Sequence, residues 1–68
     1  MSHANTASSS KDRWVLVNVL TEYTGYTDDA IRAKIRRGDW AFGALWRKAP
    51  DGRLVFNLTR IQEWMAGM

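Results

Sequence analysis

The stretch TDDAIRAKIRRG, residues 27–38, carries the clearest structural signal in the chain. Thr27 is a good N-cap, two aspartates follow in the first turn, the cations come later, and a glycine stands where a helix commonly ends. Ile31 and Ile35 are one turn apart, so they define a side that faces the core. The pattern predicts a helix over residues 28–37 with arginines on its outer face.

The preceding stretch, WVLVNVLTEYTG, begins as a short extended apolar run and then becomes helical. Val17, Leu20 and Tyr23 recur at the three-residue spacing that lines one side of a helix. The closing glycine is a common C-terminal residue. We expect a first helix near residues 17–24, joined to the second by a tight turn.

Residues 46–57, WRKAPDGRLVFN, predict a two-stranded hairpin. Pro-Asp-Gly supplies the turn. The alternation places Leu54 and Phe56 on one face and Val55 on the other, as in a half-buried strand. The segment 40–46, with small residues between aromatic ones, is expected to be a loop that runs into the first strand.

A last helix follows the hairpin, with Asn57 or Thr59 as its cap and an end near Ala66. Its apolar stripe consists of Leu58, Ile61 and Trp64 or Met65. The order of elements indicates the α+β class. The expected architecture is a small winged helix-turn-helix: a helix-turn-helix, a two-stranded hairpin wing and a C-terminal helix.

The length of 68 residues allows one domain. Residues 1–12 are mostly small and polar, which predicts a disordered N-terminal tail ahead of a domain spanning 13–68. The absence of cysteine excludes disulfides and thiolate metal sites, and indicates an intracellular protein. No apolar run approaches the ~20 residues needed to cross a bilayer, and no signal peptide is visible.

An enzyme is the least expected class. The only histidine, His3, lies in the predicted tail, where it has no fixed geometry. Asp28 and Asp29 are adjacent on a helix, so their side chains diverge by ~100° and do not converge on one site. We therefore expect no catalytic residue, no metal and no cofactor.

Four tryptophans supply much of the core that so small a domain needs. We expect each to be mainly a core residue, with Trp40 and Trp46 the most exposed because they flank the hairpin. Stacking on unpaired bases is the alternative role for these rings.

Positive charge is concentrated between residues 32 and 53, which hold seven cations and two anions, whereas the whole chain has a net charge of +3. A charged helix face is commonly only a solvated surface. Here, however, a helix and a hairpin tip both carry clustered cations, which favours double-stranded DNA, whose major groove admits a helix and whose phosphates attract cations. The candidate DNA-binding residues are Thr27, Arg32, Lys34, Arg36, Arg37, Arg47, Lys48 and Arg53.

The candidates divide by expected role. Arg32 and Arg36 are the best base-reading candidates, because guanidinium groups bind guanine bidentately. The wing cations Arg47, Lys48 and Arg53 are expected to contact phosphate or the minor groove. At the start of the second helix Thr27 could face base edges, but the structural role of a cap is favoured.

Two stretches, LTEYTGYTDDAIRAKIRRGDW and WRKAPDGRLVFNLTRIQEWM, together resemble the small winged-helix excisionases of temperate phages and integrated elements. The resemblance covers about residues 14–66. It implies a recombination directionality factor that binds and bends DNA without catalysis, helps a tyrosine integrase to excise a prophage, and binds adjacent sites cooperatively. It also implies a location at the nucleoid, in the cytoplasm of a bacterial host. The second helix would enter the major groove, and the wing would lie along the adjacent minor groove.

Two alternatives stay open. The same architecture resembles MerR-like and other small phage regulators, which would make the chain a transcriptional regulator, since a fold alone does not decide function. A protein interaction module that presents a basic face to an acidic partner is the rival from outside the DNA-binding class.

Overall fold

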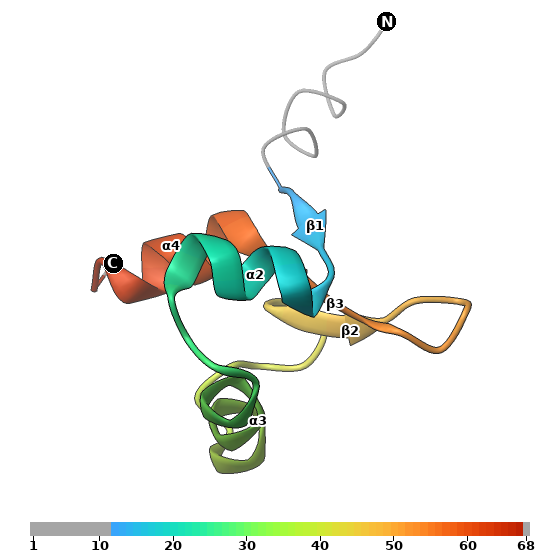
Figure 1. The fold of residues 1–68 in the computed structure, drawn as a ribbon, viewed down its shortest axis with the longest axis horizontal. Coiled ribbons are helices and arrows are strands. Elements are labelled where there is room, and N and C mark those ends of the chain that lie inside the picture. Colours follow the sequence, from blue (N-terminus) through green and yellow to red (C-terminus); the bar gives the residue numbers. More distant parts are fainter. Residues whose placement is uncertain (1–11, 68) are drawn as a thin grey trace, which may run out of the picture.

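The computed structural model describes residues 12–67, and over this range it contains three helices and one three-stranded antiparallel sheet (Figure 1). The elements are β1 (Trp14–Val15), α2 (Val17–Thr24), α3 (Asp28–Arg37), β2 (Trp46–Lys48), β3 (Leu54–Asn57) and α4 (Leu58–Met65). This confirms the α+β class. The tail predicted for residues 1–12 lies outside the described residues except for its last member.

The two helices of the helix-turn-helix begin and end where local signals predict. Gly25 follows α2 with φ +80°, and its N–H donates to the carbonyl of Thr21 at 2.8 Å. Thr27 caps α3, because its hydroxyl accepts a hydrogen bond from the N–H of Ala30 at 3.1 Å. Gly38 closes α3 with φ +79°, in the left-handed region that a glycine adopts without strain.

The sheet has one strand more than the sequence predicts. Its order is β1-β3-β2, so the wing hairpin of β2 and β3 gains β1 as a third strand. β1 is only two residues long, too short for a recognisable alternation, and it is fixed by distant partners. Val15 pairs with Phe56, and the carbonyl of Arg13 accepts from the N–H of Leu58 at 2.7 Å.

The strand register assigns each side chain to one of two faces. Residues directly opposite one another in an antiparallel ladder share a face. Trp46 is opposite Phe56, and Lys48 is opposite Leu54, so all four share one face. We call this face, which carries the buried Phe56, the inner face. The alternate positions of the strands form the outer face.

Trp40 lies at the centre of the core, with 1% of its surface exposed. Its ring makes edge contacts with those of Tyr26, Phe56 and Trp64, at centroid distances of 6.2, 6.3 and 5.8 Å. The expectation that Trp40 would be partly exposed is therefore wrong. The loop after Trp40 turns back, and the indole N–H of Trp46 donates to the Trp40 carbonyl at 3.0 Å, which keeps Trp40 inside the molecule. The half-buried Trp46 agrees with expectation.

Asn57 is the buried polar residue that joins the sheet to the last helix. It ends β3 and caps α4, since its side-chain oxygen accepts from the N–H of Arg60 at 3.1 Å. Its side-chain amide donates to the carbonyl of Ala44 at 3.3 Å, and its backbone N–H donates to that of Leu45 at 2.8 Å. One side chain thus fixes the start of α4 and the loop that leads into the wing.

Replacing Asn57 by Ala tests this junction. We expect Asn57→Ala to lower the free energy of unfolding by about 2–3 kcal/mol, because it removes a cap, deletes a buried side-chain amide and leaves two partly buried backbone groups without partners. Thr27→Ala, which removes an exposed cap, is the control and should cost about 1 kcal/mol. Urea denaturation measures both, and equal losses would contradict the account.

Candidate nucleic-acid interface

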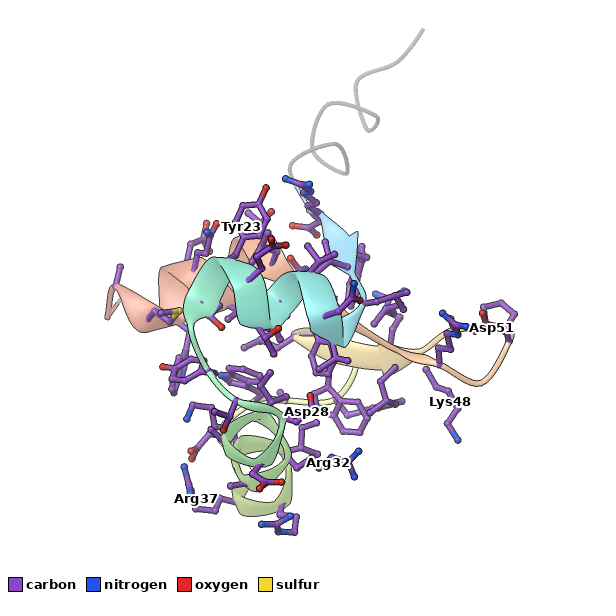
Figure 2. The ribbon with its side chains drawn as sticks, viewed as in Figure 1. Tyr23, Asp28, Arg32, Arg37, Lys48 and Asp51 are labelled. Carbon is purple, nitrogen blue, oxygen red and sulfur yellow. The ribbon has the colours of Figure 1, made fainter. Side chains whose placement is uncertain are left out.

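An open groove of about 600 Å³ separates α3 from the wing. Its floor is apolar and includes Ile31 and Ile35 of α3 together with Leu54 and Phe56 of β3. Its basic lining residues come from both sides, Arg32 and Arg36 from α3 and Arg53 from the wing. The two basic elements identified in the sequence therefore border one groove, and Figures 1 and 2 show α3 and the wing on either side of this space.

The arginines of α3 follow one stripe of the helix. Arg32 and Arg36 are spaced four residues apart, so both project from the same side. Both are exposed, and neither has a hydrogen bond, an ion pair or a ring contact within residues 12–67. Their guanidinium groups are free to bind a ligand.

The wing adds two more cations. Lys48 lies on the inner face opposite Leu54, and Figure 2 shows it pointing from the wing toward the side on which α3 lies. It too has no partner in the described part of the chain. Arg53 has only a weak one: its Nε lies 4.0 Å from Asp51, and both side chains are about two-thirds exposed (68% and 66%), where solvent screens the attraction.

The loop that joins β2 to β3 is held by its own backbone. The N–H of Ala49 donates to the carbonyl of Arg53 at 2.7 Å, and the N–H of Gly52 donates to that of Ala49 at 2.9 Å. The carboxylate of Asp51 accepts from the N–H of Arg53 at 3.0 Å. The Pro-Asp-Gly turn thus presents Arg53 at a defined position at the edge of the groove.

Other cations of α3 are engaged within the protein. The Nη2 of Arg37 lies 2.9 Å from the carboxylate of Asp39, and Figure 2 shows Arg37 on the opposite side of the helix from Arg32. The ammonium of Lys34 lies 4.1 Å from the ring centroid of Tyr26. These two candidates therefore do not join the groove.

Arg47 lies on the outer face of the sheet, away from the groove. Its guanidinium carbon is 4.1 Å from the ring centroid of Trp14, and its Nη2 donates to the carbonyl of Gly43 at 3.2 Å. Strand alternation explains this position, because Arg47 is the middle residue of β2, between two inward-facing neighbours. The structure therefore separates Arg47 from the other wing cations.

The groove also contains features that the sequence analysis did not assign to it. Asp28 lines the groove beside the arginines. Its position on the same side of α3, four residues before Arg32, is the sequence signal that could have predicted this. The first turn of α2 opens onto the same space. Leu16, which precedes this helix, provides no side-chain cap, and the first turn contains no acidic residue. The exposed N–H groups of such a helix end add positive potential. Thr27, by contrast, is occupied as a cap.

The remaining cations of the described chain have partners elsewhere. Arg13 lies over the ring of Tyr23 at 5.3 Å, and Arg60 lies 3.5 Å from Asp12. Over residues 12–67, the unpartnered cations are Arg32 and Arg36, which line the groove, and Lys48, which extends from the inner face of the wing toward the side of α3; Arg53, which also lines the groove, is nearly free. A polyanion would meet its available cations there.

Within residues 12–67 there is neither a metal-binding cluster nor a membrane-spanning helix. Residues 12–67 contain no group of three or more histidine, cysteine, aspartate or glutamate side chains that could hold a metal ion. Among the same residues, no helix is long and apolar enough to span a bilayer.

A family model matches almost the whole chain. The model of a family described as "Putative excisionase (DUF1233)" matches residues 6–68. No curated protein and no solved structure matches the chain.

Proposed function

Because the chain belongs to this excisionase family, it is a DNA-binding protein of phage excision, and we propose that it binds and bends the attachment-site arm and thereby directs a tyrosine integrase toward prophage excision. In this role it is an accessory factor without catalysis or cofactor. It would act on DNA in the cytoplasm of the bacterial host, at the nucleoid. Several copies would bind adjacent sites cooperatively.

The position of the unpartnered cations is the observation that carries the proposal. A duplex presents a major groove wide enough for a helix, bordered by sugar-phosphate strands. With α3 in the major groove and the wing at the adjacent minor groove, one strand of the backbone passes between them. Its phosphates would meet Arg53, its deoxyribose carbons would meet the apolar floor at Leu54, and Arg32 and Arg36 would extend past it to the base edges.

Each cation has a distinct role in this arrangement. Arg32 and Arg36 extend from the groove-bound helix and read base edges, preferring guanine. Lys48 and Arg53 bind phosphate or the minor groove and set position. Lys34 and Arg37 make at most secondary contacts, because each would first have to leave its intramolecular partner.

Bending follows from binding two neighbouring grooves at once. A rigid body that contacts the major groove with α3 and the next minor groove with the wing holds the backbone at the angle set by its own shape. Residues of α3 and of the base of the wing pack on the same core, which holds the two contacts in a fixed relation, and the contacts made at both grooves would offset the cost of bending the duplex.

The salt dependence of duplex binding tests the interface. With two phosphate-neutralising cations, Lys48 and Arg53, we expect log K to fall with log[salt] with a slope of about −1.8. Arg53→Ala should reduce the steepness by about 0.9, whereas Arg36→Ala, which removes a base contact, should leave the slope nearly unchanged. Arg60→Ala is the matched control, since Arg60 is exposed but paired with Asp12, and should leave the slope unchanged. An absence of duplex binding at low salt would refute the proposal and favour a protein interaction module.

Selection from a randomised duplex library separates the two roles. We expect Arg36→Ala to relax the base preference at one position by about 5- to 100-fold, and Arg53→Ala to weaken binding to all sequences alike. If Arg53→Ala altered the selected sequence and Arg36→Ala did not, the assignment of the reading helix would be wrong.

Excision itself is tested with a supercoiled plasmid that carries both attachment sites and with the integrase of the same prophage. Adding the protein should increase excisive recombination and not integrative recombination. The variant with both Arg36→Ala and Arg53→Ala should lose this effect. If the protein instead binds a promoter and leaves recombination unchanged, it is a MerR-like regulator.

A further inference from the structure

Arg47 connects the two edge strands of the sheet. β1 and β2 flank β3 and share no ladder with each other. Arg47 is opposite Val55, and Trp14 is opposite Asn57, so both side chains start from the outer face. The guanidinium carbon of Arg47 nevertheless lies 4.1 Å from the Trp14 ring centroid, so the two side chains together span the outer face of β3.

The same guanidinium also holds the loop that leads into the wing. Its Nη2 donates to the carbonyl of Gly43 at 3.2 Å. The N–H of Gly43 in turn donates to the carbonyl of Trp46. Arg47 is thus attached to β1 and to the loop before β2, on the face opposite the groove.

The wing depends on attachments at its base. Beyond Lys48 the loop makes hydrogen bonds within itself, such as that of Ala49 with Arg53, and its inner side meets the open groove rather than a packed layer. At its base, the indole of Trp46 donates to the Trp40 carbonyl on the inner face. Arg47 is the corresponding attachment on the outer face.

We propose that Arg47 is a positioning residue for DNA binding: it does not contact DNA but, by bridging Trp14 and Gly43, fixes the angle of the wing so that Lys48 and Arg53 lie in register with the arginines of α3. The inference rests on the proposed function for its consequence on DNA. An exposed cation–π contact shifts a two-state equilibrium by about 2- to 5-fold, and this sets the size of the effects below.

A double-mutant cycle in duplex binding tests the proposal. Arg47→Met removes the charge and keeps an apolar stem, and should weaken binding about 2- to 5-fold. In that background Arg53→Ala should cost about 2- to 5-fold less than in the wild type, because the wing no longer holds Arg53 in place. Lys48→Met is the control, because Lys48 lies on the same strand as Arg47 but on the opposite face, and its loss also removes one positive charge. It should reduce the salt slope by about 0.9 and leave the effect of Arg53→Ala unchanged. Arg47→Lys keeps a cation over Trp14 and should restore the coupling.

Hydrogen exchange of the free protein provides a readout that needs no DNA. Arg47→Met should speed exchange of the wing amides, such as those of Ala49 and Gly52, and leave the amides of α3 unchanged, whereas general destabilisation would speed both. The proposal is overturned if the affinity losses of Arg47→Met and Arg53→Ala are independent, so that their fold-changes multiply in the double variant, and if Arg47→Met also reduces the salt slope by about 0.9. Such a reduction marks a direct phosphate contact. Unchanged wing exchange in Arg47→Met overturns it as well. If the wild type binds no duplex, the proposed function fails, and the exchange result alone decides whether Arg47 holds the wing.

Discussion

The burial of Trp40 is the constraint on which the rest of the molecule depends. Trp40 follows α3 almost directly, and its ring contacts Tyr26 before α3, Phe56 in β3 and Trp64 in α4. The ring is held by packing against these three aromatic side chains, and the hydrogen bond from the Trp46 indole to the Trp40 carbonyl holds its backbone. By placing the end of α3 against the sheet, this one side chain sets the distance between α3 and the wing.

With Trp40 in place, the alternation of side chains along β3 and β2 decides which residues face the groove. Phe56 packs under Trp40, so Leu54, two residues earlier, also lies on the inner face and forms the floor of the groove. Lys48, opposite Leu54, is carried to the same face. The cations of the wing therefore divide according to strand register, and within residues 12–67 the cations without partners are Arg32, Arg36 and Lys48.

Local signals made much of this structure predictable. The bounds of α2 and α3 are determined by caps and glycines that act within a few residues, and the outward position of Arg32 and Arg36 follows from the burial of Ile31. The sequence predicts the extended run at Trp14–Val15 but not its place in the sheet, because that place depends on pairing with β3, which is distant in sequence. The sequence also could not assign Arg47 to a face of the sheet. That assignment depends on Trp46 and Lys48 facing the inner side, which the pairing of β2 with β3 decides.

The central claim is that α3 and the wing together enclose one strand of the DNA backbone. It is tested most directly by titrating the isotopically labelled protein with a duplex and mapping changes in amide and arginine side-chain NMR resonances. The account predicts that the largest changes fall on Arg32, Arg36 and Arg53 and on amides near Lys48, with Arg60 unaffected. Changes concentrated on the outer face of the sheet or along α4 would contradict it.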